Sequence, residues 1–227
     1  MKLKAPKGAN YYKVLRQMHV AFKPELYFEI GTNRGKSLEH ASCASIAVDP
    51  EFKLRREIMG KKPSLLMFSE TSDDFFDHAE HSFNGKKVDL AFLDGMHLFE
   101  YLLRDFMNIE PYVAHGARVI LHDCLPHTQN MAERDRSKTK TWAWTGDVWK
   151  LVPILREYRP DLKITLLDAA PTGLVMIEDM DPSSTVLKDN YDKIVADYMD
   201  RILTDNQADP TIATDQWTAM KDVAWYK

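Results

Sequence analysis

Acid and imidazole side chains follow two apolar segments of this 227-residue chain. The first segment leads into Asp94 and His97, and the second, a helix length later, ends in His122 and is followed by Asp123. If the two segments are neighbouring parallel strands, their carboxyl ends lie at one edge of the sheet, where open α/β sheets bind ligands. Two carboxylates and two imidazoles at one edge can hold a divalent metal ion or form an acid–base centre.

The rest of the chain contains the elements that such a sheet needs. Short apolar segments alternate with helical patterns at 98–112 and 147–158, which predicts βαβ units and a mainly parallel α/β sheet covered on both faces. The turn-like segment 168–173 predicts an antiparallel hairpin at the end of the sheet. The predicted strands are 26–30, 45–49, 64–68, 88–93, 118–122, 163–167 and 173–178.

Length and composition fit one globular domain, with 44% hydrophobic and 28% charged residues. We expect an N-terminal helical segment over 1–24, a core over 25–180 and a C-terminal helical extension over 185–227. Within the core, the polar segment 125–146 carries Trp142 and Trp144 directly after a site-bearing strand. A long connection at that place is typical of a lid or binding loop. The two tryptophans cover an acceptor when the loop closes, or they pack on a partner subunit.

The charge and the cysteine content narrow the class of partner and the compartment. A formal net charge of −4 provides no basic field for a phosphate backbone, so we expect no nucleic-acid partner. Cys43 and Cys124 are the only cysteines and form no disulfide framework, which favours a reducing compartment. The basic segment 1–8 lacks the apolar stretch of a signal peptide, and no apolar segment has membrane-spanning length. We therefore expect a soluble cytoplasmic protein with no membrane partner.

A glycine turn follows the first predicted strand. Gly31 allows the backbone to approach a ligand closely, and Gly35 allows the following helix start to pack against the strand. The spacing differs from the G-x-G-x-x-G of dinucleotide folds, and Glu29 stands just before the first glycine. The turn either binds a ligand or is a tight connection without one.

The next two strands end in polar residues. Asp49 ends the second strand, where a ribose diol needs a bidentate acceptor; alternatively it caps a helix with Pro50 at its first position. Thr71, Ser72 and Asp73 follow the third strand, near where an adenine edge would lie. For Ser72 and Asp73 the alternative is a cap of the predicted helix over 75–82.

Taken together, these motifs resemble class I S-adenosylmethionine-dependent methyltransferases. The closer resemblance is to the subgroup related to macrocin-type sugar O-methyltransferases and cephalosporin-biosynthesis methyltransferases, and it covers about residues 25 to 180. The motifs that carry it are Glu29-x-Gly31-x-x-x-Gly35, Asp49, the segment 92–101 with Asp94-Gly-x-His97, Asp105, Gly116, His122-Asp123 and the segment 146–150.

The resemblance implies a seven-stranded Rossmann-like sheet with an antiparallel final strand, and in addition a homodimer. It implies that the methionine part of the cofactor lies at the glycine turn, the ribose at Asp49 and the adenine near Thr71 and Ser72. Asp94 would line the same site. The residues implied at the glycine turn are Glu29, Gly31, Thr32, Asn33, Gly35 and Ser37.

In metal-dependent relatives, the acid matching Asp94 and an acidic pair after the next strand hold a divalent ion, and a histidine matching His97 is the base. Here the acidic pair reads His122-Asp123, so an imidazole replaces one carboxylate. Oxygen ligands alone suit Mg²⁺, whereas an added imidazole favours Mn²⁺ and the later transition metals. Strand alternation points His122 away from Asp123 unless the strand ends between them. Asp94 and Asp123 are therefore the first candidate ligands, and His122 is the third.

The sequence thus predicts an S-adenosylmethionine-dependent O-methyltransferase acting on a small-molecule hydroxyl of a sugar or secondary metabolite, with metal assistance by Mg²⁺ or Mn²⁺. Asp94 and His97 are the predicted catalytic residues; the alternatives are helix capping for both and a surface position for His97. Two other functions fit the cluster at the strand ends. One is a metal-dependent hydrolase or lyase without a methyl donor, and the other is a non-catalytic cofactor-binding module.

Overall fold

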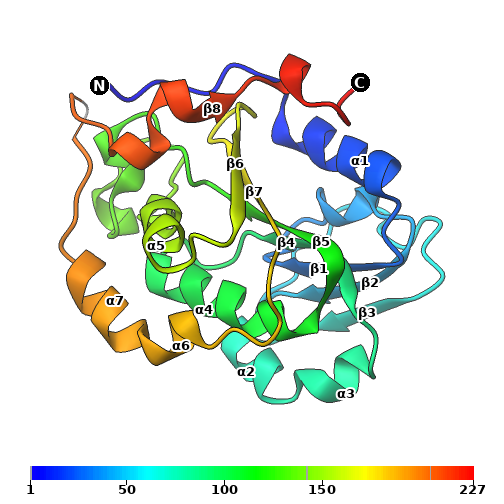
Figure 1. Ribbon diagram of the computed structural model, residues 1–227. Helices are drawn as coiled ribbons and strands as arrows, with labels where there is room; N and C mark the ends of the chain where they lie inside the picture. Colours follow the sequence, from blue (N-terminus) through cyan, green and yellow to red (C-terminus); the bar gives the residue numbers. More distant parts are fainter. Residues whose placement is uncertain (1, 142, 205) are drawn as a thin grey trace.

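A computed structural model describes residues 2–141, 143–204 and 206–227 of the chain (Figure 1). Its centre is an eight-stranded mixed sheet in the order β3-β2-β1-β4-β5-β7-β6-β8. The strands are β1 (Leu26–Ile30), β2 (Ala44–Val48), β3 (Leu65–Phe68), β4 (Val88–Leu93), β5 (Val113–His122), β6 (Lys163–Leu167), β7 (Leu174–Glu178) and β8 (Trp217–Thr218).

Strands β1 to β5 run parallel to one another, whereas β7 is antiparallel to both β5 and β6. The sequence-based expectation of seven strands is wrong by one, because the C-terminal segment adds β8. Trp217 pairs with Leu166 on β6, and this short parallel contact extends the sheet at its edge. The central strands β1 and β4 are almost entirely buried, as expected for strands covered on both faces.

One face of the sheet is covered by six short helices that share a single apolar core. Their aromatic and aliphatic residues, such as Phe75, Phe106 and Leu155, are buried against Phe28 and Leu93 of the sheet. The predicted helices over 75–82, 98–112 and 147–158 all lie on this face, each as an α-helix joined to another short helix. The α-helices are α2 (Ser72–Asp77), α3 (Ala79–Phe83), α4 (Phe99–Ile109), α5 (Leu151–Tyr158), α6 (Val186–Asp189) and α7 (Tyr191–Tyr198).

The other face is covered by α1 (Tyr11–Phe22) and by the C-terminal segment (Figure 1). Val14, Leu15 and Met18 of α1 are buried against the sheet. A helix start after the glycine turn was predicted, but the described residues 31–43 contain only the 3-10 turn Leu38–His40. The prediction is wrong because α1 already occupies this face, so the connection from β1 to β2 forms the turn and one short 3-10 segment.

The ends of the chain are less helical than their sequences predict. Within 1–24, the helix spans only Tyr11–Phe22; it begins after Asn10, whose side chain accepts from the Tyr12 N–H at 3.0 Å. Within the described part of 185–227, α6 and α7 end by Tyr198, and isolated 3-10 turns and β8 follow. Packing explains the difference, since Met220 and Val223 contact the sheet core from an irregular segment.

Short 3-10 helices complete the description. They are η1 (Leu38–His40), η2 (Glu110–Tyr112), η3 (Gln129–Ala132), η4 (Arg136–Lys138), η5 (Val148–Lys150), η6 (Pro210–Ile212), η7 (Thr214–Gln216) and η8 (Met220–Asp222). None of the helices in the described part of the chain is long and apolar enough to cross a membrane.

Candidate functional site

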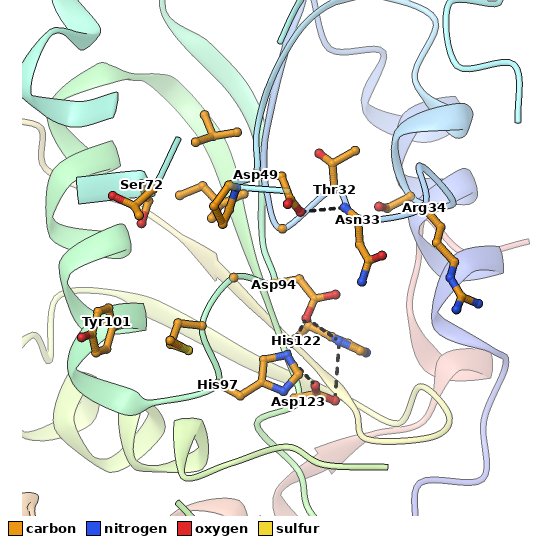
Figure 2. Close-up of a pocket in the computed structure, with 18 of the residues that line it drawn as sticks. Thr32, Asn33, Arg34, Asp49, Ser72, Asp94, His97, Tyr101, His122 and Asp123 are labelled. Atoms are coloured by element: carbon orange, nitrogen blue, oxygen red, sulfur yellow. Dashed lines mark hydrogen bonds and ion pairs between the residues drawn. The ribbon is translucent and has the colours of Figure 1, made fainter. Parts of the chain in front are cut away.

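A cavity of about 620 Å³ opens at the carboxyl ends of β1, β2, β4 and β5 (Figure 2). This is the sheet edge at which the sequence placed its candidate residues. The wall formed after β1 and β2 is called here the turn wall, and the wall formed after β4 and β5 is called the cluster wall. Most predicted site residues line this cavity: Gly31, Thr32, Asn33, Ser37, Asp49, Thr71, Ser72, Asp94, His97, His122 and Asp123.

The backbone angle and the close packing at position 31 both require glycine, whether or not a ligand is bound. Gly31 has φ +84°, and a Cβ there would lie 1.9 Å from the carbonyl oxygen of Asp94. The turn after β1 therefore packs directly against the segment after β4, and a side chain would separate the two walls. Gly35 has φ +76°, a Cβ there would lie 2.6 Å from Cγ2 of Ile58, and the residue does not line the cavity.

Glu29 lies behind the turn and does not line the cavity. Its side chain is fully buried, and Oε2 accepts from the Tyr27 hydroxyl at 2.6 Å. Burial raises the pKa of Glu29 to about 7, although the hydrogen bond from Tyr27 opposes the shift. A direct contact of Glu29 with the cofactor therefore stays a prediction.

Asp49 fastens the turn wall. Its Oδ2 accepts from the backbone N–H of Asn33 at 2.7 Å (Figure 2). Its Oδ1 accepts from the N–H of Glu51 at 2.8 Å. No helix follows Asp49 among the described residues up to β3, so the helix-cap alternative is wrong. A carboxylate has about four lone-pair sites, so two remain for the hydroxyls of a ligand in the cavity.

The residues after β3 both cap a helix and line the cavity. Thr71 is the N-cap of α2, with its Oγ1 accepting from the Asp74 N–H at 3.2 Å. Ser72 is the first residue of that helix and faces the cavity (Figure 2). Asp73 is held by a bidentate pair with Arg104, at 2.8 and 2.7 Å. The cap therefore belongs to Thr71 and not to Ser72 or Asp73.

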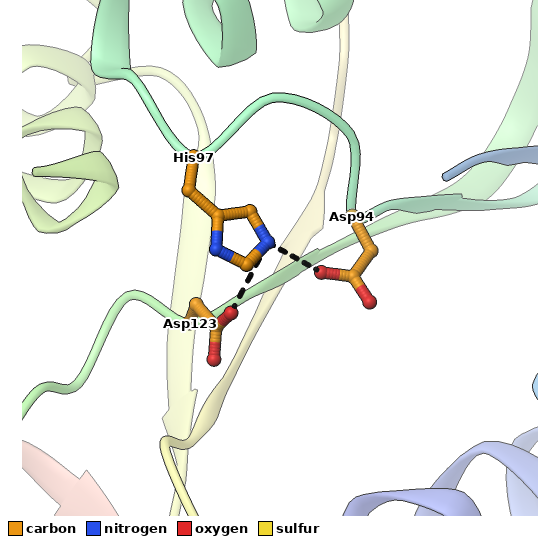
Figure 3. A group of neighbouring side chains, drawn as sticks. All are labelled: Asp94, His97 and Asp123. Atoms are coloured by element: carbon orange, nitrogen blue, oxygen red, sulfur yellow. Dashed lines mark ion pairs between the residues drawn. The ribbon is translucent and has the colours of Figure 1, made fainter. Parts of the chain in front are cut away.

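The cluster wall brings the four acid and imidazole side chains together. β5 ends at His122, and Asp123 has φ +60°, so the side chains of both residues turn toward Asp94. Nδ1 of His122 lies 3.0 Å from Oδ1 of Asp94 and 3.5 Å from Oδ1 of Asp123. Nε2 of His97 lies between the carboxylates, 3.5 Å from Asp94 Oδ1 and 3.4 Å from Asp123 Oδ2 (Figure 3).

The charges of the cluster stabilise one another. Burial alone would raise the pKa of Asp94, but His122 and His97 hold it well below its usual range. Burial opposes the charged form of His97, yet Asp123 and Asp94 raise its pKa to about 9. The same two carboxylates raise the pKa of His122 against the effect of burial. Asp94 and the two histidine rings therefore favour one another's charged forms.

The loop after β5 fixes the orientation of His97. Nδ1 of His97 lies 2.8 Å from the carbonyl oxygen of Trp144, so Nδ1 donates and Nε2 faces the carboxylates. The Trp144 ring packs on the imidazole at 5.1 Å between centroids. A Cβ on Gly146 would lie 1.7 Å from the carbonyl oxygen of His97. The described part of 125–146 is thus packed against the site, and Trp142 lies outside the described residues.

The loop is also held by an ion-pair network. Arg134 contacts Glu100 of α4 at 2.6 Å and the buried Asp147 at 2.6 Å. Asp147 also pairs with the buried Lys150 at 2.8 Å and accepts from the Phe99 N–H at 3.1 Å. These contacts connect the loop to the start of the helix that follows β4.

The donor set at the cluster wall fits a divalent cation. Asp94, His97 and Asp123 can each direct one ligand atom to within 4.8 Å of the others. Two carboxylates and an imidazole suit Mn²⁺ and later transition metals, and the carboxylates alone suit Mg²⁺. The sequence-based set contained His122 in place of His97. His122 directs Nδ1 at Asp94 and approaches Thr172 with Nε2 at 3.4 Å, so both of its nitrogens already face protein groups.

Several residues of the cavity were not predicted from the sequence. Tyr11 and Tyr12 of α1 line it, and the Tyr11 ring packs on His122 at 4.1 Å. Arg34 and Lys36 line it from the exposed side of the turn after β1. No local motif marks Tyr11 or Tyr12, because α1 reaches the site only through long-range packing.

Comparison with known proteins agrees with this geometry. Residues 28–124, from β1 to the end of β5, match a family model described as a methyltransferase domain. That match covers less than half of the chain. A sequence comparison with curated proteins finds no match.

Solved structures share the fold at low sequence identity. An O-methyltransferase from Bacillus cereus, solved in complex with SAH, has a TM-score of 0.55 at 13% identity, covering 77% of this chain and 83% of that chain. The O-methyltransferase TomG from Streptomyces achromogenes, solved in complex with SAM, has a TM-score of 0.54 at 12% identity, covering 75% and 80%. The chain therefore has the α/β Rossmann-like methyltransferase fold, here with an eight-stranded mixed sheet.

Proposed function

We propose that the protein is an S-adenosylmethionine-dependent methyltransferase. The observation that supports this most is the cavity itself, in which the turn wall with Asp49 faces the cluster wall with Asp94 and His97. The methyltransferase-domain match over residues 28–124 spans both walls. A hydrolase or lyase would need the cluster wall alone, and it would leave the turn wall without a role.

The cofactor would lie along the turn wall. Asp49 would accept from the ribose hydroxyls with its remaining lone pairs. The backbone at Gly31 and the polar groups of Thr32, Asn33 and Ser37 would surround the methionine part. Thr71 and Ser72 would lie at the adenine end, where the N-terminus of α2 meets the cavity.

The acceptor would lie at the cluster wall, and we propose a small-molecule hydroxyl of a sugar or secondary metabolite. Methyl transfer from a sulfonium is an in-line displacement, so the enzyme must align the hydroxyl and make it nucleophilic. His97 is the proposed proton acceptor, through Nε2 of its neutral form, because its Nδ1 donates to the Trp144 carbonyl. A divalent cation held beside the ring by Asp94 and Asp123 would favour that neutral form. We also propose that the protein belongs to the macrocin-type subgroup of these methyltransferases.

A divalent metal ion, Mg²⁺ or Mn²⁺, is also part of the proposal. Asp94 and Asp123 would hold it, with His97 or His122 as the nitrogen group nearest to it. When bound, such an ion lowers the pKa of a hydroxyl that contacts it. The predictions of a homodimer, of a cytoplasmic location and of no nucleic-acid partner stay predictions.

Titration calorimetry with S-adenosylhomocysteine tests the proposal. We expect binding by the wild-type protein and an affinity at least tenfold weaker for Asp49→Ala, since one charged hydrogen-bond partner contributes about 1.5–3 kcal/mol. The control is Glu51→Gln, two residues away and 74% exposed, which should bind like the wild type. No binding by the wild-type protein would favour the hydrolase or lyase, and an unchanged affinity of Asp49→Ala would overturn the ribose assignment.

A further inference from the structure

The turn between β6 and β7 reaches the cluster wall from a distant part of the chain. Thr172 in this turn is buried, and its hydroxyl donates to Oδ1 of Asp123 at 2.5 Å. Its carbonyl oxygen accepts from the Leu125 N–H at 2.9 Å. One residue thus contacts both the side chain of Asp123 and the backbone just after it, where the chain turns at φ +60°.

The single hydroxyl proton of Thr172 fixes the direction of the contacts around it. The Thr172 hydroxyl donates to Oδ1 of Asp123, so its proton lies on that bond. The Thr172 oxygen is then the acceptor toward Nε2 of His122, 3.4 Å away. His122 would then donate from Nε2 to Thr172, while its Nδ1 faces Asp94. A hydrogen-bonded series results, from His122 through Thr172 to Asp123.

In this series the two carboxylate oxygens of Asp123 have different partners. Oδ1 is engaged by Thr172 at 2.5 Å and lies 3.5 Å from Nδ1 of His122. Oδ2 faces Nε2 of His97 at 3.4 Å (Figure 3). Without the Thr172 contact, rotation of the carboxyl group could exchange the two oxygens.

The N-terminal segment 7–11 holds the turn that carries Thr172. The N–H groups of Lys7 and Gly8 donate to Oδ1 of Asp168 at 2.7 and 3.2 Å. Ala170 exchanges backbone hydrogen bonds of 2.9 Å with Ala9 and Tyr11. Gly8 approaches so closely that a Cβ there would lie 1.7 Å from the Asp168 carbonyl oxygen. Tyr11, the last residue of this segment, packs its ring on His122.

We propose that Thr172 is a positioning residue, which holds Asp123 so that Oδ2 faces His97 and the acceptor, and that segment 7–11 holds its turn in place. The inference rests on the proposed methyltransferase function and adds to it a residue that contacts neither cofactor nor acceptor. It assigns His122 to the same supporting role, with its ring in contact with Thr172, Asp94 and Tyr11.

Three variants separate this role from general packing. Thr172→Val keeps the shape and removes the hydroxyl, whereas Thr172→Ser keeps the hydroxyl. Thr165→Val, a half-buried position on β6, is the matched control. With an acceptor identified from a panel of hydroxyl compounds, Thr172→Val should lower kcat by about tenfold or more. The KM for the cofactor and the Kd for S-adenosylhomocysteine should stay within twofold, and Thr172→Ser should recover most of the activity.

A second measurement needs no acceptor. A ring N–H that donates to a buried hydroxyl exchanges slowly, so His122 should give a protected Nε2–H signal in ¹H–¹⁵N spectra of the wild type and of Thr172→Ser. The signal should be lost or shifted in Thr172→Val. Its absence from the wild type, or an unchanged signal in Thr172→Val, would overturn the inference. Failure of the protein to bind S-adenosylhomocysteine would instead overturn the proposed function, so the two outcomes are distinguishable.

Asp168→Ala tests the contribution of segment 7–11. The loss of two hydrogen bonds to Lys7 and Gly8 should lower kcat in the same direction as Thr172→Val but by a smaller factor. A wild-type kcat in Asp168→Ala would remove segment 7–11 from the inference while Thr172 is judged by its own variants.

Discussion

The turn wall and the cluster wall of the cavity are stabilised over different distances in the sequence. The turn wall depends on contacts between near segments, such as the Asn33 N–H with Asp49, sixteen residues apart. The cluster wall depends on distant ones: His97 is bonded to Trp144, 47 residues away, and Asp123 to Thr172, 49 residues away. The comparison shows that local backbone geometry forms one wall, whereas the tertiary fold must assemble the other.

The largest effect should come from the cluster wall. His97→Asn removes the proposed proton acceptor, and we expect kcat to fall by about 10²- to 10⁴-fold. The affinity for S-adenosylhomocysteine, measured by calorimetry, should stay within twofold, because the turn wall is untouched. His115→Asn, an exposed position on β5, is the control. A loss of cofactor affinity equal to the loss of kcat would mean that the two walls do not act independently.

Gly31→Ala should damage both walls at once. The new Cβ would lie 1.9 Å from the Asp94 carbonyl oxygen, and the alanine would also have to adopt φ +84°. We expect a loss of roughly 3 kcal/mol in the free energy of unfolding, measured in urea. Gly85→Ala is a close control, because its φ is +74° and its Cβ would meet nothing within 4 Å. An equal loss in both variants would show that backbone strain alone, and not contact between the walls, requires glycine at position 31.

The smallest effect concerns the carboxyl group beneath the turn wall. Burial raises the pKa of Glu29 to about 7, so the folded protein favours its protonated form. Its contribution to stability is therefore complete below the unfolded pKa near 4.5 and is lost as the pH rises through about 7. Glu29→Gln should remove this loss, which is about 3 kcal/mol at most.

Urea unfolding at pH 4.5, 6 and 7.5 measures this difference for Glu29→Gln and for the exposed control Glu25→Gln. The control should follow the wild type at every pH. Parallel curves for Glu29→Gln and the wild type would show that Glu29 is ionised in the folded protein at neutral pH.

Much of the sheet could be predicted from the sequence. Apolar segments identified β1, β4 and β6 with their observed bounds, because buried strands need such segments whatever covers them. The prediction of a helix after Gly35 was wrong, because the local sequence does not indicate that α1 covers that face of the sheet. The prediction of a helical extension over 185–227 was wrong beyond α7. There the segment is held by the packing of Met220 in the core and by the pairing of β8 with β6.

The candidate site divides in the same way. The sequence alone determined the strand ends and hence the positions of Asp49, Asp94, His97, His122 and Asp123 on one edge, because parallel strands place their carboxyl ends together. Only the tertiary structure decided how these groups point. The left-handed turn at Asp123, the Trp144 carbonyl at His97 and the Thr172 hydroxyl at Asp123 all depend on residues far along the chain. Hydrogen bonds between distant segments have no local sequence pattern, since they exist only after the core has packed.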